Sequence, residues 1–288
     1  MMSPRTLLVV FAHPDDESFG PGGTLARYAA EGVAVHVICA TRGEAGAVTG
    51  ELAEGYSSLA EQRTAELHCA AEVLGLAGVH FLGYRDSGMA GSPHNAHPQS
   101  LVQADPDAVA GQVTALMRKL RPQVVITFDP QGGYGHPDHI AMHHAAVRAF
   151  HAAGDATTYQ EQLKNGLTPS APQKLYYTAF SRRLLRWLVR LMPLFGYNPT
   201  AFGVNRDINL KAIVAVDTPI TTRINVSAYL ETKQAAAACH RSEGGPAGPY
   251  DRLPRLLARR LLSVETFTRA YPPLNPSEPV EDDLFALV

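Results

Sequence analysis

The apolar run TLLVVFA at residues 6–12 constrains the fold of this chain more than any other feature. It shows no alternation of polar and apolar residues, so a strand formed here must be covered on both faces, as the strands of parallel sheets are. Comparable runs follow at residues 33–40, 79–82 and 123–128. We therefore expect these four segments to be strands of one buried sheet.

Helical patterns separate these strands. They occupy residues 22–31, 57–74, 105–120 and 137–153. Within them, Ser58 and Glu61 have the spacing of a capping box, and Pro137 suits the first position of a helix. Strands that alternate with helices predict an α/β fold, namely a Rossmann-like, doubly wound, mainly parallel sheet with right-handed crossovers.

The length of 288 residues allows a single domain. We assign residues 1–154 to the Rossmann-like core and residues 155–288 to a C-terminal cap region that completes the fold. Within this region, residues 212–216 are interpreted as a strand and residues 227–239 as a helix.

Residues 181–195 form an amphipathic pattern, with arginines on one face and large apolar residues on the other. Such a helix can be a lid over a site, an oligomer contact or a membrane-surface helix. A homo-oligomer is therefore one of the interpretations that the sequence leaves open.

Charge and hydropathy exclude several classes of function. Lys and Arg total 25 against 27 Asp and Glu, so the net charge of -2 provides no general attraction for nucleic acid. No apolar stretch reaches the roughly 18 residues expected of a membrane span. The three cysteines, Cys39, Cys69 and Cys239, lack CxxC spacing, which predicts reduced thiols in a cytoplasmic protein.

The sequence HPDDE at residues 13–17 follows the first predicted strand. Imidazole and carboxylate groups are ordinary zinc ligands, and a strand end followed by a proline-containing turn holds them rigidly. Asp15 and Asp16 are consecutive and point in different directions. One of them can bind metal while the other handles protons.

The sequence GGYGHPDH at residues 132–139 follows the strand predicted at residues 123–128. His136 and His139 are three residues apart at a helix start, so both can face one crevice. Ligands of a doubly wound sheet bind at the carboxyl ends of its strands, where both motifs fall.

Two sets of metal ligands are compatible with these motifs. His13, Asp16 and His139 would leave coordination positions open, as catalytic zinc sites do. His139 and His143 lie four residues apart on one predicted helix and form a competing pair.

Together the motifs resemble those of the PIG-L/LmbE family of metal-dependent de-N-acetylases, with AHPDDE near the N-terminus and HPDH after a later strand. The resemblance extends to residues 41–46, Arg63, Glu66, residues 82–89, Lys233, residues 240–242 and residues 265–267. Within the family, the chain resembles enzymes of low-molecular-weight thiol metabolism, which act on GlcNAc-inositol or GlcNAc-malate. It also resembles the related thiol-conjugate amidases.

The resemblance implies a hydrolase that removes the N-acetyl group from a GlcNAc conjugate. It implies that His13, Asp16 and His139 bind zinc, with iron(II) as an alternative, and that Asp15 is the general base. The chemistry agrees, because zinc lowers the pKa of bound water and a nearby carboxylate can take the remaining proton.

Further roles follow from the same resemblance and from the charge that develops during amide hydrolysis. Tyr134 and a protonated His136 are candidates to stabilise the oxyanion, and His136 could protonate the leaving amine. Asp138 would orient an imidazole. By the resemblance, Arg63, Asp86 and His240 would contact the substrate.

Two rival functions remain at the level of sequence. One is a thiol-conjugate amidase that uses the same metal chemistry on a larger acyl group. The other is a non-catalytic protein that binds a small amino-sugar conjugate. Asp15 argues against the second, because zinc binding does not require a spare carboxylate.

Overall fold

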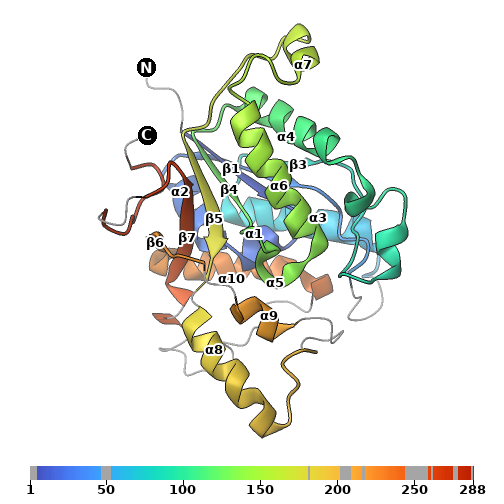
Figure 1. The fold of residues 1–288 in the computed structure, drawn as a ribbon, viewed down its shortest axis with the longest axis vertical. Helices are drawn as coiled ribbons and strands as arrows, with labels where there is room; N and C mark the ends of the chain where they lie inside the picture. The colour runs from blue at the N-terminus through green and yellow to red at the C-terminus, as the bar shows by residue number, and fades with distance from the viewer. Residues whose placement is uncertain are drawn as a thin grey trace.

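The computed structural model describes residues 5–46, 53–180, 182–201, 209–215, 218–243, 259–260, 262–274, 278–286 and 288. These residues form a seven-stranded sheet of order β3-β2-β1-β4-β5-β7-β6 (Figure 1). The strands are β1 (Thr6–Phe11), β2 (Ala34–Cys39), β3 (Gly78–Phe81), β4 (Val124–Thr127), β5 (Lys174–Ala179), β6 (Thr222–Asn225) and β7 (Val264–Tyr271).

The sheet is parallel from β3 to β5 and antiparallel only at β7, which pairs with both β5 and β6. At its centre, Val9 of β1 lies between Val37 of β2 and Ile126 of β4. The expected Rossmann-like, mainly parallel sheet is confirmed.

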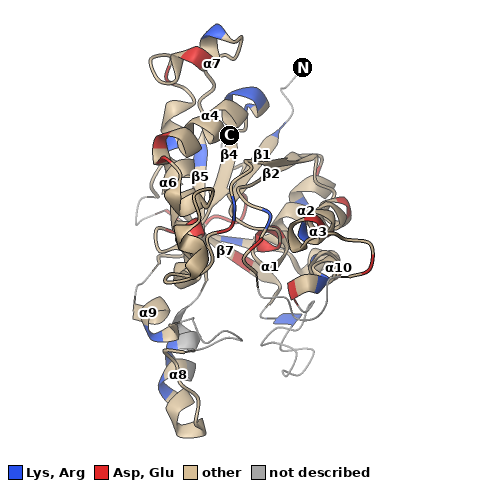
Figure 2. Cartoon of the chain, turned by 90° about the vertical axis from the view of Figure 1, so that its right-hand side faces the viewer, with Lys and Arg blue, Asp and Glu red and all other residues tan. Residues whose placement is uncertain are grey.

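Helices cover both faces of the sheet. Figure 2 shows α4 and α6 on one side and α2, α3 and α10 on the other. The described helices are α1 (Asp16–Phe19), α2 (Gly22–Ala30), α3 (Leu59–Leu74), α4 (Pro106–Leu120), α5 (Gly132–Gly135), α6 (Pro137–Ala152), α7 (Gln160–Lys164), α8 (Arg182–Leu191), α9 (Leu210–Ala215) and α10 (Leu230–Cys239).

β1 lies at the centre of the hydrophobic core. Leu7, Leu8, Val9 and Val10 are all fully buried, so both faces of the strand are covered. Burying an aliphatic side chain of this size contributes about 1.5–3 kcal/mol. The uninterrupted apolar run in the sequence is thus explained by its central place between two helical layers.

Two predicted helix starts can be checked against the structure. The Ser58 hydroxyl accepts a hydrogen bond from the Glu61 amide at 3.2 Å, while the Glu61 carboxylate accepts one from the Ser57 amide at 2.9 Å. Ser58 therefore caps the helix as predicted, but the Glu61 carboxylate accepts from the amide of Ser57 instead of that of Ser58. Pro137 is the first residue of α6, as predicted.

The strand predicted at residues 212–216 is wrong, because these residues up to Ala215 belong to helix α9; residue 216 lies outside the described residues. The side chain of Asn209 accepts a hydrogen bond from the Ala212 amide at 3.1 Å. A short apolar run fits a strand or a helical turn, and a preceding Asn cap favours the helix. The sequence pattern also predicts none of β5, β6 and β7.

Helix α8 lies beside α9, beyond the end of the sheet (Figures 1 and 2). Its Trp187 side chain is 63% exposed. No helix in the described part of the chain is both long and apolar enough to cross a bilayer. The lid, oligomer and membrane-surface interpretations of residues 181–195 stay predictions, and residue 181 lies outside the described residues.

The expectation of reduced thiols is wrong for two of the three cysteines. Cys69 of α3 and Cys239 at the end of α10 form a disulfide, with Cα atoms 5.9 Å apart. Cys39 is buried and free. The two bonded cysteines are 170 residues apart in sequence, and only the packing of α3 against α10 brings them together.

Reduction of this disulfide is expected to lower the melting temperature by several degrees. The crosslink joins residues 170 positions apart, and a loop of this size stabilises a fold by about 2–5 kcal/mol. Each kcal/mol corresponds to about 2–4 °C in a chain of this size. Thermal melting with and without a reductant measures the shift. As a control, the Cys69→Ser/Cys239→Ser variant should not respond to the reductant; equal melting of oxidised and reduced wild type would contradict the prediction.

Candidate active site

Both sequence motifs lie where the order of the sheet reverses. From β1 the chain proceeds outward to β2 and β3, then returns to β4 on the other side of β1. The loops that leave β1 and β4 therefore diverge and form a crevice at the carboxyl ends of these strands. HPDDE follows β1 and GGYGHPDH follows β4, so His13 and His139 meet although they are 126 residues apart.

His13, Asp16 and His139 form a compact triangle of donor atoms. His13 Nδ1 lies 3.2 Å from His139 Nε2. Asp16 Oδ2 lies 3.7 Å from His13 Nδ1, and Asp16 Oδ1 lies 3.3 Å from His139 Nε2. A tetrahedral ion with bonds of about 2.1 Å sets its ligands about 3.4 Å apart. The spacing of these atoms therefore fits one divalent cation.

The second polar atom of each of these side chains already has a partner. His13 Nε2 lies 3.2 Å from the Asp138 carboxylate, and His139 Nδ1 lies 3.2 Å from the Gly132 carbonyl. Asp16 Oδ2 accepts a hydrogen bond from the His13 amide at 2.8 Å. Such contacts fix the tautomer and direction of metal-binding imidazoles. The remaining atoms, His13 Nδ1, His139 Nε2 and Asp16 Oδ1, are left for a cation.

Further potential ligands surround this triangle. His136 joins His13 and His139 in one group of potential ligands, and His13, Asp86, His136 and Asp138 form another; within each group the donor atoms lie within 4.8 Å of one another, and Asp16 belongs to neither. Asp138 Oδ1 is buried and has no hydrogen-bond partner among the described residues. The crevice is therefore rich in donor atoms, and it contains an orphaned carboxylate oxygen of the kind a bound ligand would satisfy.

His143 is not part of any group of potential ligands in the described residues. Its Nδ1 lies 2.9 Å from the Phe128 carbonyl, and its ring packs against Tyr177. The structure does not bring together the competing pair His139 and His143 as one set of ligands.

Opposing effects act on the imidazoles of the triangle. Burial by itself would lower the pKa of His13, but the neighbouring carboxylates of Asp86 and Asp138 outweigh it and raise that pKa. Burial and the adjacent His13 lower the pKa of His139. His13 therefore tends to be protonated in the metal-free protein, whereas His139 tends to be neutral. A metal cation that displaced the proton of His13 would be bound by two neutral imidazoles.

Asp15 has a strained backbone beside the triangle. Its φ and ψ angles are 125° and -31°, a conformation that costs a non-glycine residue about 1–3 kcal/mol. Arg63 Nη2 donates to the Asp15 carboxylate at 3.1 Å and to the Pro14 carbonyl at 2.8 Å. Burial raises the pKa of Asp15 to about 8, although the Arg63 charge acts in the opposite direction. This carboxyl group therefore exchanges protons near neutral pH.

His136 of the second motif is the N-cap of α6, where its Nδ1 accepts a hydrogen bond from the Asp138 amide at 3.2 Å. Burial, together with the charge of His13, lowers the pKa of His136 to about 3. The expectation of a protonated His136 is therefore wrong for the metal-free protein. Because Nδ1 accepts, Nε2 carries the proton of the neutral ring and remains a donor. The Tyr134 ring lies edge-on to those of His136 and His139 and is 40% exposed.

The predicted substrate residues form an inner polar network. Arg63 is buried and contacts Asp15 as well as Glu243, whose carboxylate lies 3.0 Å from Arg63 Nη1. Asp86 is buried, with its carboxylate 3.5 Å from His13 Nε2. His240 is fully buried, so it does not face an open crevice in this structure.

Sequence reasoning assigned no role to several residues of this network. Glu17 accepts a hydrogen bond from His240 at 2.7 Å, and Glu66 accepts two from Ser242. Glu243 directly follows the 240–242 landmark, and proximity in sequence is the one signal that could have identified it. Glu17 belongs to the HPDDE motif but has no neighbour in sequence that predicts its partner.

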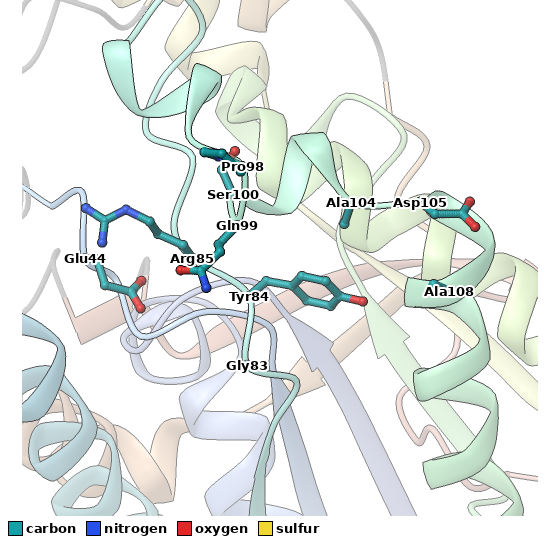
Figure 3. Close-up of a pocket in the computed structure, with 10 residues that line it drawn as sticks. All are labelled: Glu44, Gly83, Tyr84, Arg85, Pro98, Gln99, Ser100, Ala104, Asp105 and Ala108. Atoms are coloured by element: carbon teal, nitrogen blue, oxygen red, sulfur yellow. The ribbon is translucent and has the colours of Figure 1, made fainter.

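A pocket of about 420 Å³ lies on the Asp86 side of the centre. Figure 3 shows Glu44 and Arg85 at one end of this pocket, with the Tyr84 ring extending toward Asp105 at the other. Glu44 connects the pocket to the centre, because its carboxylate accepts a hydrogen bond from the Asp86 amide at 3.0 Å. The pocket thus offers polar lining next to the metal donors.

Known proteins resemble this chain in sequence. The family model "PIG-L: GlcNAc-PI de-N-acetylase" matches residues 8–150. A protein of Thermobifida fusca named 1D-myo-inositol 2-acetamido-2-deoxy-alpha-D-glucopyranoside deacetylase is 40% identical, and the match covers 99% of this chain and 100% of that protein. The chain belongs to the PIG-L family.

Other relatives extend the comparison. A PIG-L relative of Catenulispora acidiphila, named 1D-myo-inositol 2-acetamido-2-deoxy-alpha-D-glucopyranoside deacetylase 2, is 37% identical over 98% of this chain and 97% of its own length. The solved structure of N,N'-diacetylchitobiose deacetylase from Pyrococcus horikoshii has a TM-score of 0.64 and 21% identity, covering 93% of this chain and 84% of that one. At this identity the likeness shows a shared fold alone.

Proposed function

We propose that this PIG-L protein is a zinc-dependent deacetylase that hydrolyses the N-acetyl group of a GlcNAc-inositol conjugate. The observation that carries the proposal is the donor triangle of His13, Asp16 and His139 beside the half-buried carboxyl group of Asp15. The names of the relatives from Thermobifida fusca and Catenulispora acidiphila support the substrate class.

Zinc is the proposed metal because the triangle offers two imidazoles and one carboxylate, a donor set typical of catalytic zinc sites. Iron(II) accepts the same ligands and remains the alternative. When bound, the ion supplies Lewis acidity that activates water and polarises the acetyl carbonyl.

The side chains of the crevice supply the proton transfers. Asp15 takes a proton from the attacking water, and Arg63 keeps its carboxylate in place. His136 Nε2–H and the Tyr134 hydroxyl donate to the oxyanion that develops on the acetyl group. The proton that Asp15 has taken from water then passes to the departing amine while His136 keeps its Nε2–H, and Asp138 holds the ring of His13.

The charges around the crevice favour a neutral aglycone over an acidic one. Arg63 is the buried cation at this site, and it already contacts the carboxylates of Asp15 and Glu243. On the side of the pocket, Glu44, Asp86 and Asp105 add negative charge, and Arg85 is the one cation among the described residues that line the pocket. A malate group would bring two more carboxylates into this environment, whereas inositol brings hydroxyl groups that can donate to them.

We expect acetate release from GlcNAc-inositol to exceed that from GlcNAc-malate by about tenfold or more in kcat/KM. This ratio corresponds to about 1.4 kcal/mol of like-charge repulsion, a modest value for partly buried groups. Acetate is measured enzymatically with both substrates under identical metal loading. Equal or inverted preference would contradict the charge argument.

The rival functions are tested in the same assay. Faster cleavage of a cysteinyl amide on the same sugar would identify a thiol-conjugate amidase. Tight binding of acylated amino-sugars without any turnover would identify a binding protein. The cytoplasmic location and the homo-oligomer considered from the sequence stay predictions.

A further inference from the structure

Glu17 is a buried carboxylate with no role in the proposed chemistry. It is 1% exposed and lies two residues after Asp15 in the HPDDE motif. Glu17 Oε2 accepts a hydrogen bond from the Asp15 amide at 3.0 Å. Its Oε1 accepts hydrogen bonds from Ser18 at 2.5 Å and from His240 at 2.7 Å. One carboxylate thus joins the backbone of the proposed base to a residue 223 positions away.

The backbone of Asp15 needs such support. A φ of 125° is rare for a residue with a side chain and persists only when the surroundings hold it. Glu17 holds the amide nitrogen of Asp15, and Arg63 holds its carboxylate and the preceding carbonyl of Pro14. The direction of the Asp15 carboxylate is therefore fixed from two sides.

Both supports depend on the segment that follows α10. His240 contacts Glu17, and Glu243 contacts Arg63 at 3.0 Å. The start of this segment is tied to α3 by the disulfide of Cys239. The C-terminal half of the chain thus contacts both residues that hold Asp15.

The burial of His240 argues for an internal role. Its side chain is 0% exposed, and its Nδ1 has no hydrogen-bond partner among the described residues. The contact with Glu17 is the hydrogen bond that orients the ring. To contact substrate directly, the ring would have to leave this position. The buried Glu17 carboxylate would then lose the hydrogen bond from His240.

We propose that Glu17 and His240 are positioning residues for Asp15. By accepting a hydrogen bond from the Asp15 amide, Glu17 stabilises the positive-φ backbone of Asp15. His240 in turn donates to the Glu17 carboxylate and keeps it within reach of that amide. This inference rests on the proposed role of Asp15 as the base. It replaces substrate contact as the role of His240.

The proposal predicts a specific kinetic defect. If the Asp15 backbone relaxes, its carboxylate moves away from the attacking water, and a shift of about 1 Å can lower the rate by about 10²-fold. The donor triangle does not include His240, and Asp16 is held by the amides of Ala12 and His13. We therefore expect kcat to fall while KM and metal content change little.

The test compares two substitutions of one residue in the full-length, metal-loaded enzyme. His240→Phe keeps a ring of similar size but removes the donor, and it should lower kcat by about 10- to 100-fold with KM within about twofold. His240→Gln restores an N–H donor and should recover most of kcat. Ser242→Ala is the matched control, because it removes the hydroxyl hydrogen bond to Glu66 from the same segment without touching Glu17; its kcat should stay within about threefold of wild type.

Further measurements separate positioning from damage to the fold. Circular dichroism and bound metal are recorded for every variant, and Glu17→Gln provides the same test should His240→Phe fail to fold. In an Asp15→Ala background, His240→Phe should cause no further loss of kcat, because both act through one group. Wild-type kcat in His240→Phe, a defect confined to KM, or no recovery in His240→Gln would overturn the proposal. Full activity of Asp15→Ala itself would instead overturn the proposed function.

Discussion

Asp15→Ala is expected to lower kcat for deacetylation by about 10³-fold or more. General bases contribute about 10²–10⁴-fold to such reactions, and Asp15 has a raised pKa and a half-buried carboxyl group beside the donor triangle. Loss of the carboxylate removes the proton acceptor without removing any member of the donor triangle. Single-turnover acetate release, measured at saturating GlcNAc-inositol, isolates the chemical step.

Asp15→Asn is the matched variant for this prediction. It keeps the size of the side chain and one oxygen that can accept from Arg63, but it cannot take a proton at neutral pH. Both variants should retain bound metal and bind substrate with nearly unchanged affinity. Near-normal kcat in Asp15→Asn would show that another group is the base.

His139→Ala is expected to abolish stoichiometric metal binding and with it all measurable activity. It removes one of three donors, and the remaining pair, His13 and Asp16, cannot complete the site. Because a metal that binds only the folded state stabilises it, added zinc should raise the melting temperature of the wild type but not that of the variant. Metal analysis after dialysis gives the stoichiometry independently of activity.

His143→Ala is the control for this experiment, since His143 lies one helical turn further along α6 and contacts the Phe128 carbonyl instead of the donor triangle. It should retain one metal per chain and respond to zinc as the wild type does. Loss of metal in His143→Ala together with its retention in His139→Ala would reverse the assignment of ligands.

Local sequence patterns were sufficient for the core of this fold. The apolar run that forms β1 lacks alternation because helices cover both faces of the strand, and this burial can be predicted from residue type alone. Pro137 and Ser58 begin helices because their conformational and hydrogen-bonding preferences act within one turn. The elements missed were the strands β5, β6 and β7, and the α9 run was assigned to the wrong type, because these segments pair or pack with partners distant in sequence.

The metal donors could be predicted only in part from the sequence. The imidazole and carboxylate groups of HPDDE and HPDH can be read directly from the sequence. Because ligands of such sheets bind at the carboxyl ends of the strands, both motifs are expected at one edge of the sheet. Which atoms face the crevice is a property of the folded protein. The Gly132 carbonyl selects the free nitrogen of His139, and the Asp138 carboxylate selects that of His13.

The sequence by itself therefore determined the parallel core, the family and the two motifs, since each depends on residue types within short segments. Only the tertiary structure decided the strained backbone of Asp15, the contact between Glu17 and His240, and the disulfide between Cys69 and Cys239. The physical reason is the separation along the chain. A carboxylate and an imidazole 223 residues apart leave no periodic signal, and they become partners only when α10 packs against α3 beside the end of β1.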